Sequence, residues 1–211
     1  MRWPGAPLLS LTPYHVRVNA ATDPHAVRSL DALETMYPQP SRGVQLKVMD
    51  HLDAGLAATL ALSPLCVLAT GNAEGQLDCS PRGDAGSCVT LLDPHTLLLA
   101  DRPGNNRLDS LKNIVQNPEV GLIFLLPGVD EVIRVNGQAH VTTDPELLAR
   151  LALKGKLPRV VVVVKVREAF MHCPRAFKSA GLWDAGRHLT PEQRPDFTAM
   201  LVEHVRVNSG G

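Results

Sequence analysis

Residues 96–124 read TLLLADRPGNNRLDSLKNIVQNPEVGLIF, and this stretch decides the fold of the chain. An apolar run ends at Ala100, turn-forming residues fill 103–106, and apolar residues then recur at helical spacing until Asn117-Pro118 ends the pattern. A second apolar run begins at Val120. The order of these patterns predicts a strand, a turn, a helix and a second strand.

The turn and the first helical turn of this stretch concentrate groups that bind anions. They hold Arg102, Asn105, Asn106, Arg107, Ser110 and Lys112. Asn106 followed by Asp109 is typical of an N-cap with an acidic first turn, which leaves Ser110 and Lys112 available to a ligand. Because free N–H groups and cations would converge there, the stretch indicates a phosphate site. An ordinary capped surface helix with solvated charges explains the same residues equally well.

Length and composition favour one cytoplasmic domain. The 211 residues are 45% hydrophobic, which is ample for a buried core, and 21 basic residues balance 21 acidic ones. This balance gives no general attraction to nucleic acid or to an anionic membrane. The N-terminus is broken by proline and lacks the apolar region of a signal peptide, and no later run reaches membrane-spanning length. We therefore expect neither a nucleic-acid partner nor a membrane partner.

The cysteines and histidines indicate no metal site. Cys66, Cys79, Cys88 and Cys173 form no C-x-x-C pair, so we expect reduced thiols, with Cys79 and Cys88 in structural roles. The eight histidines lack ligand-like spacing, and neither a P-loop nor a G-x-G-x-x-G fingerprint is present. The sequence gives no support to nucleotide-triphosphate or Rossmann dinucleotide chemistry.

Six strands are predicted along the chain. They cover residues 65–70, 76–80, 96–100, 120–126, 131–143 and 160–166. The first two face each other across a hairpin loop. Helical spacing predicts an N-terminal helical extension over about 24–62, which includes one long amphipathic helix over 44–62. Further helices are predicted over 145–153 and 191–204. Short turns between the strands favour an antiparallel barrel with peripheral helices over a βαβ sheet.

Three segments together resemble the pyridoxamine 5'-phosphate oxidase-related family of FMN-binding split barrels. They are LCVLATGNAEGQLDCSPRGD at 65–84, NNRLDSLKNIVQNPEVGLIF at 105–124 and IRVNGQAHV at 133–141. The resemblance covers roughly residues 45–185. It implies a mainly β protein, an antiparallel six-stranded split β-barrel of the flavin reductase type, as a single domain over 1–211. It also implies FMN as cofactor and a homodimer with the flavin at the interface.

The resemblance assigns cofactor-binding roles residue by residue. Ser110 and Lys112 match the family's S-x-K phosphate element, and Asn105, Asn106 and Arg107 lie in the loop that leads to it. Arg82 matches the arginine of a strand beside the flavin, where its planar fork suits a phosphate. A hairpin arginine paired with Asp84 is the alternative role for Arg82.

The chain departs from the family's oxidases in two places. At residues 83–87 this chain reads GDAGS, whereas the family's oxidases continue the strand with apolar residues and a lysine. The C-terminal arginine-rich segment with which those oxidases bind pyridoxamine phosphate is not recognisable. Vitamin B6 oxidation is therefore not implied. Residues 170–184 instead resemble a lid, the first part of a C-terminal lid and helix over about 170–205. Trp183 could stack on the flavin, and Arg134 or Lys178 could meet its anionic edge. Alternatively, the segment is a loop tucked onto the barrel with Trp183 as a core plug.

Three classes of function follow. The first is an FMN-dependent oxidoreductase that acts on a small unidentified substrate, in which the flavin carries the redox chemistry. The second is an FMN- or haem-binding module without turnover, such as a carrier or sensor. The third is a flavin-free barrel that binds another phosphorylated ligand.

Overall fold

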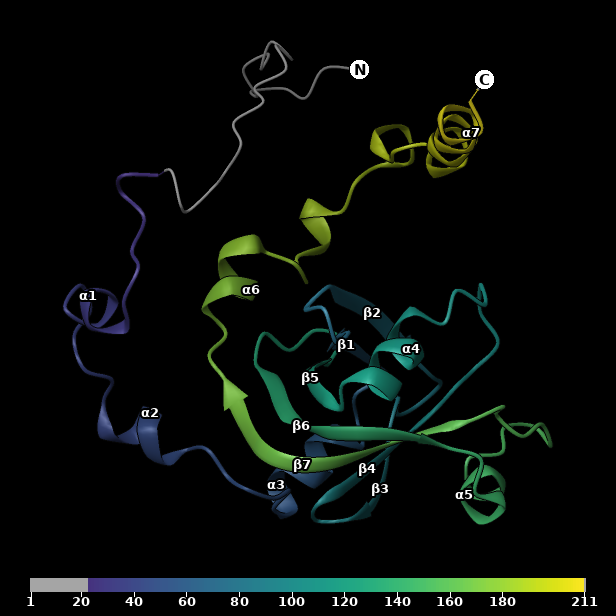
Figure 1. Ribbon diagram of the computed structural model, residues 1–211, viewed down its shortest axis with the longest axis horizontal. Helices are drawn as coiled ribbons and strands as arrows, with labels where there is room; N and C mark the ends of the chain where they lie inside the picture. Colours follow the sequence, from purple (N-terminus) through teal and green to yellow (C-terminus); the bar gives the residue numbers. More distant parts are fainter. Residues whose placement is uncertain (1–22, 211) are drawn as a thin grey trace. The chain divides into compact units, whose positions relative to one another are not determined.

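The computed structural model describes residues 23–210 (Figure 1). The chain divides between Arg42 and Gly43 into two units, 1–42 and 43–211. In the described part of the first unit lies helix α1, Leu30–Glu34, where Ser29 Oγ accepts a hydrogen bond from Ala32 N at 3.1 Å. All strands of the described residues lie in the second unit. The prediction of one domain over residues 1–211 stays a prediction.

The second unit is built on one antiparallel sheet of seven strands. Their spatial order is β2 (Leu77–Gly83), β1 (Leu65–Gly71), β5 (Glu119–Leu125), β6 (Val132–Thr142), β7 (Val161–His172), β4 (Thr96–Ala100) and β3 (Thr90–Asp93). Within the described residues no ladder joins β2 to β3, so the sheet is not closed. The predicted mainly β, antiparallel fold is confirmed. The count of six strands and the closure into a barrel are wrong.

The strand that the sequence did not reveal is β3. Its four residues are too few to show a two-residue period, and its register against β4 shifts between Leu91 and Asp93. It is a strand because Thr90 pairs with Leu98 and Leu91 with Leu97 of β4. Its extended conformation therefore depends on pairing with another strand and not on a local pattern.

One face of the sheet is buried along β1 and β5, whereas both faces are buried along the first part of β7. Along β1 and β5, buried and less buried side chains alternate, as expected when one face meets the core. Phe124 of β5, at 0% exposure, is the largest fully buried side chain. In β7 residues 161–164 are all buried, because a second small cluster with Leu98 and Leu151 covers the other face. Helix α5, Pro145–Arg150, packs Leu147 and Leu148 against that cluster.

The N-terminal helical extension predicted over 24–62 is mostly not helical. The structure has only short helices there, α1, α2 (Arg42–Leu46) and α3 (Ala54–Leu60). Between α2 and α3, Met49 and Ala169 of β7 exchange backbone hydrogen bonds of 3.0 and 2.8 Å. These bonds hold the backbone extended, so a continuous helix over 44–62 is wrong. Helix α3 begins after Asp53, whose carboxylate accepts from Leu56 N at 2.7 Å.

The C-terminal segment is divided into several short pieces. After β7 come α6 (Arg175–Ala180), 3₁₀ turns at Ala185–Arg187 and Pro191–Gln193, and α7 (Phe197–Asn208). A single helix over 191–204 is wrong because Pro195 has no N–H for the helical ladder. Helix α7 begins after Asp196, whose side chain accepts from Ala199 N at 2.9 Å. Among residues 23–210, no helix is both long and apolar enough to cross a bilayer.

Candidate functional site

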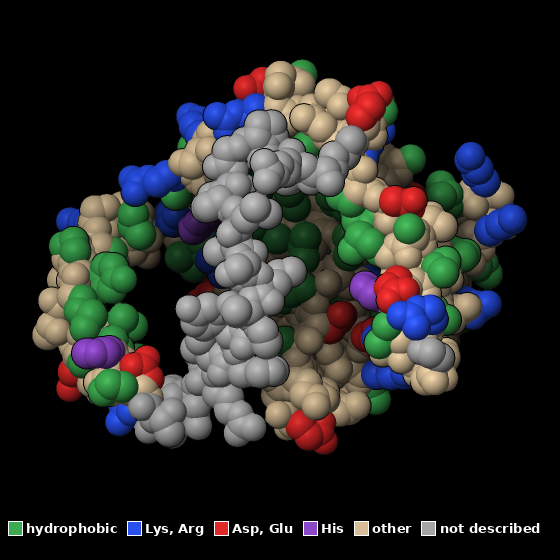
Figure 2. Space-filling view, turned by 90° about the horizontal axis from the view of Figure 1, so that it is seen from above, with side chains coloured by type: hydrophobic (Ala, Val, Ile, Leu, Met, Phe, Trp, Pro, Cys, Tyr) green, Lys and Arg blue, Asp and Glu red, His purple; other side chains and the backbone are tan. Residues whose placement is uncertain are grey.

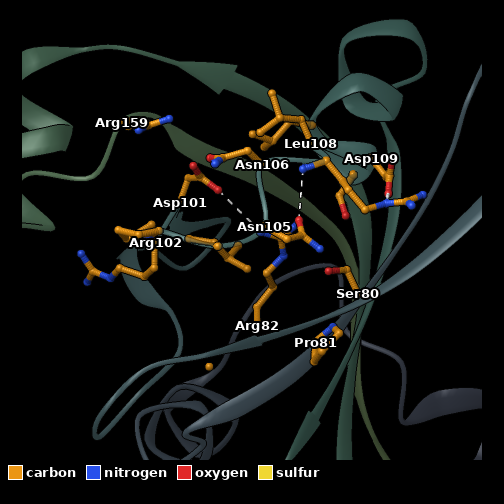
Figure 3. A pocket seen from close by; sticks show the side chains of 18 of the residues that line it. Ser80, Pro81, Arg82, Asp101, Arg102, Asn105, Asn106, Leu108, Asp109 and Arg159 are labelled. Atoms are coloured by element: carbon orange, nitrogen blue, oxygen red, sulfur yellow. Dashed lines mark hydrogen bonds and ion pairs between the residues drawn. The ribbon is translucent and has the colours of Figure 1, made fainter. Parts of the chain in front are cut away.

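A cavity of about 500 Å³ lies between β2, the loop that follows β4 and the start of helix α4, Asp109–Gln116 (Figure 3). This volume falls in the range of small-molecule sites. Six residues that the sequence singled out line it: Arg82, Arg102, Asn105, Asn106, Arg107 and Ser110. The strand, turn, helix and strand predicted for residues 96–124 are all present, and their turn forms one wall of the cavity.

Helix α4 points an uncapped N-terminus at the cavity. Its N-cap position is Leu108, in the left-handed conformation with φ of +63°, and no side chain of the described residues caps it. The prediction of Asn106 as N-cap is wrong, because Asn106 itself has φ of +59° and the helix begins three residues later. An uncapped helix start leaves N–H groups to satisfy and carries partial positive charge, which suits an anion.

Ser110 lies at the wall, but its hydroxyl has a protein partner. The residue is 1% exposed, and its Oγ donates to Asp78 Oδ2 of β2 at 2.6 Å. A phosphate bound here would therefore meet the Asp78 carboxylate as well as the Ser110 hydroxyl. Arg107 is also engaged: its Nε donates to Asp109 at 2.8 Å, and this bond raises the pKa of the Arg107 guanidinium.

Arg82 is a wall residue with an unused hydrogen-bond donor. Its nearest acid is Asp101, 3.7 Å from Nη1, which is a loose ion pair (Figure 3). Its Nε is buried and has no hydrogen-bond partner among the described residues. A buried donor without an acceptor is costly, and a bound anion would satisfy it.

The alternative in which Arg82 pairs with Asp84 is wrong. Asp84 is occupied by Arg102, whose Nη2 and Nε lie 2.6 and 2.8 Å from Oδ2. Arg102 Nη1 also donates to Leu151 O at 2.9 Å. Arg102 therefore ties the loop after β4 to the hairpin and to the end of α5, and it shapes the wall.

The cavity also contains residues that the sequence did not single out. Asp78, Asp101 and Arg159 line it, and Figure 3 shows Arg159 well apart from Arg82. Arg159 is exposed and has no ion-pair partner among residues 23–210. No local signal marks it, because it lies between α5 and β7 and only the tertiary fold brings it here. Asp101 lies in the stretch 96–124, where an aspartate beside turn-forming residues is common and does not indicate a ligand site.

Four other predicted residues lie outside this cavity wall. Lys112 is exposed on α4, and Arg134 on β6 lies over the Phe170 ring at 5.2 Å. Lys178 and Trp183 line a separate cavity of about 370 Å³. Trp183 is half-buried, and its Nε1 donates to Val129 O at 2.9 Å. Their predicted contact with a flavin stays a prediction.

The first cavity is built for binding more than for acid–base chemistry. Among the described residues its wall has no His, the side chain whose ordinary pKa lies nearest neutrality, and no Lys or Tyr. It does offer an uncapped helix start and an arginine with an unsatisfied donor. These features fit the phosphate of a flavin mononucleotide, which would bring its own redox chemistry.

The cysteines carry no disulfide. Cys66 and Cys88 are buried and free, whereas Cys79 and Cys173 are exposed and free. Within residues 23–210 no group of three or more His, Cys, Asp or Glu side chains could hold a metal ion.

One comparison with known proteins identifies a family. The family model described as Pyridoxamine 5'-phosphate oxidase matches residues 52–173, which are 122 of the 211 residues. No curated protein matches the chain. HupZ of Group A Streptococcus is 19% identical, with 56% of this chain and 93% of that one aligned at a TM-score of 0.47.

Two other solved structures give similar alignments. A candidate pyridoxamine 5'-phosphate oxidase from Lactobacillus delbrueckii is 25% identical, covering 58% of this chain and 95% of that one, at a TM-score of 0.44. An FMN-binding protein from Syntrophomonas wolfei is 17% identical, covering 56% and 82%, at a TM-score of 0.43. At these TM-scores the structures add no argument to the match of the family model.

Proposed function

The chain belongs to the pyridoxamine 5'-phosphate oxidase family, and we propose that it is a flavoprotein that binds FMN in the cavity beside α4. The observation that carries the proposal is Arg82, a residue of the cavity wall whose buried Nε has no partner in the described residues. A phosphate oxygen would supply the missing acceptor. The uncapped start of α4 lies on the same wall and would contribute N–H groups.

The charges of the wall define what the phosphate would meet. Arg159 has no carboxylate partner among the described residues, and Arg82 has only the loose one at 3.7 Å, Asp101. Arg102 and Arg107 are paired with Asp84 and Asp109. Asp78 lies at the helix start beside Ser110 and would repel an anion. The phosphate is therefore expected to bind near Arg82. The Ser110 hydroxyl would donate to the phosphate in place of Asp78, and Lys112 would contact the phosphate from outside the cavity wall.

With FMN bound, we propose that the protein acts as an oxidoreductase on a small substrate. The flavin would carry the redox step, and the chain would place the ring and exclude water. A non-catalytic FMN- or haem-binding module is the alternative. Anaerobic NADH or NADPH separates the two, because an oxidoreductase should be bleached and then reoxidised by an added acceptor, whereas a carrier should not turn over.

The cofactor is tested by mass spectrometry of the small molecule that leaves the purified protein on heat denaturation. We expect FMN. The flavin-free protein should then bind FMN more tightly than riboflavin, because only FMN carries the phosphate that Arg82 and α4 would hold. A colourless protein that binds neither flavin, or one that releases haem, would overturn the proposal.

We further propose that the protein is a homodimer in which each flavin is completed by the partner chain. The family resemblance supports this, and so do large apolar side chains left at the surface (Figure 2). On two elements that border the cavity, Leu77 of β2 and Val115 of α4 are 85% and 78% exposed. Exposed apolar area of this kind is stabilised when a second copy covers it.

Subunit mixing tests whether sites are shared. An Arg82→Ala chain and a Trp183→Ala chain are mixed and allowed to exchange, each being expected to bind FMN weakly alone. If Arg82 and Trp183 of one site come from different subunits, the heterodimer holds one intact site and recovers part of the binding. Verified exchange without recovery, or a monomer that binds FMN fully, would refute shared sites.

A further inference from the structure

Asp78 places a carboxylate at the start of helix α4. It lies on β2, is half-buried, and lines the first cavity together with Ser110. Its one side-chain partner among the described residues is the Ser110 hydroxyl, which donates to Asp78 Oδ2 at 2.6 Å. A helix N-terminus without a side-chain cap attracts anions, so Asp78 and a bound phosphate would compete for the same region of the cavity.

No cation is paired with the Asp78 carboxylate. Within residues 23–210, no Lys, Arg or His lies at ion-pair distance from it. On β1, the residue opposite Asp78 in the ladder is the uncharged Thr70. The charged side chains of the other surrounding elements are Arg82 on β2, Asp101 after β4, Arg107 before α4, and Asp109 and Lys112 on α4. Four of these form two pairs, Arg107 with Asp109 at 2.8 Å and Arg82 with Asp101 at 3.7 Å.

A phosphate that contacts Ser110 must come close to Asp78. Ser110 is 1% exposed, and its hydroxyl has a single hydrogen, which Asp78 already accepts. A phosphate oxygen at hydrogen-bond distance from Ser110 Oγ would lie at most about 5.3 Å from Asp78 Oδ2. If Ser110 donates to the phosphate, Asp78 loses its donor. Two ionised acids this close also disfavour each other's charge, and a second hydrogen between them removes both difficulties.

We infer that the site selects a phosphate monoester that keeps its second hydrogen, and that Asp78 accepts this hydrogen. The inference rests on the proposed binding of FMN. Ser110 and the N–H groups of α4 would donate to the other phosphate oxygens, and the P–O–H group would donate to Asp78. Asp78 is then a specificity-determining residue. It favours phosphate monoesters, which can retain a hydrogen near neutral pH, over sulfate, which cannot.

The sign of the pH dependence follows from the phosphate. A free phosphate monoester loses its second hydrogen with a pKa of about 6. In the bound state Asp78 raises this pKa, because it accepts the hydrogen and disfavours a second negative charge beside it. FMN affinity is therefore highest below a pH of about 6 and falls by up to about tenfold per pH unit above it. In Asp78→Asn this fall should disappear. Riboflavin, which has no phosphate, controls for every other titration of the protein.

Phosphorus NMR of bound FMN measures the ionisation of the phosphate directly. It is recorded for wild type, for Asp78→Asn and for the control Glu119→Gln. Glu119 pairs with Arg167 outside the cavity wall, so the control removes one negative charge elsewhere. At a pH of about 7.5, where free FMN is mostly doubly ionised, the bound signal should be that of the singly ionised ester in wild type and in Glu119→Gln. In Asp78→Asn it should be that of the doubly ionised ester.

Competition at constant ionic strength is an independent test. Near neutral pH, inorganic phosphate should displace FMN from wild type and sulfate should not, whereas both should displace it from Asp78→Asn. Circular dichroism confirms that each variant is folded. A doubly ionised signal in wild type, the same signal in Asp78→Asn as in wild type, or equal displacement by the two anions overturns this inference alone. A protein that binds FMN no more tightly than riboflavin at any pH refutes the proposed phosphate site and the inference with it.

Discussion

Arg82→Ala should separate flavin binding from folding. In the chain without ligand, the Arg82 guanidinium has two opposing effects on the free energy of unfolding. Its ion pair with Asp101 is loose at 3.7 Å, so it contributes about 0–1 kcal/mol. Its buried Nε, with no partner among the described residues, costs about 1–3 kcal/mol. Because removal of the side chain cancels both, we expect the free energy of unfolding to rise by about 0–3 kcal/mol in urea denaturation.

Binding of FMN should respond much more strongly. A charge-assisted hydrogen bond to phosphate contributes about 1.5–3 kcal/mol, and about 1.4 kcal/mol is a factor of ten in affinity. Arg82→Ala should therefore weaken FMN by roughly 10- to 150-fold, whereas riboflavin, which lacks the phosphate, should change little. Fluorescence titration of the flavin-free protein measures both dissociation constants, and their ratio reports the phosphate contact.

A matched control is Arg167→Ala. Arg167 lies on β7, is exposed, and pairs with Glu119 at 3.2 Å, away from the cavity wall. The Arg167→Ala substitution removes one positive charge, as Arg82→Ala does, so it controls for the long-range effect of charge on FMN binding. Equal weakening of FMN and riboflavin in Arg82→Ala, or a loss in Arg167→Ala as large as in Arg82→Ala, would refute the reasoning.

Three further changes test the site and the fold. Asp78→Asn should tighten FMN several-fold but leave riboflavin unchanged, because about 1 kcal/mol of repulsion from the phosphate is removed; weaker FMN binding would contradict this. Phe124→Ala should lower the free energy of unfolding by about 3–5 kcal/mol in urea, and a loss under 1 kcal/mol would deny its core role. Gly137→Ala would push a Cβ into the Lys165 backbone, so its melting temperature should fall, unlike that of Gly43→Ala, where the new Cβ meets nothing within 4 Å.

Local patterns in the sequence were enough to predict most of the strands and the helix of the central stretch. β4, α4 and β5 follow one another as expected from residues 96–124, and the hairpin of β1 and β2 lies where its loop residues indicated. Strand alternation, helical spacing and turn residues are properties of neighbouring positions, so they can be read without the fold. The same locality explains why Asn105, Asn106, Arg107 and Ser110 were found together: they lie on one turn and the helix it begins.

What only the tertiary structure decided depends on partners far away in the chain. β3 is extended because it pairs with β4, and Met49 leaves its expected helix because it bonds to Ala169. Ser110 donates to Asp78, 32 positions away, and Arg102 pairs with Asp84, the carboxylate that the alternative role of Arg82 required. A buried polar group of the backbone or a side chain needs a hydrogen-bond partner, and it bonds to whichever group the fold brings close to it. The local sequence pattern does not show which group that is. The unsatisfied Arg82 Nε is a consequence of that assembly, which is why it emerged only from the structure.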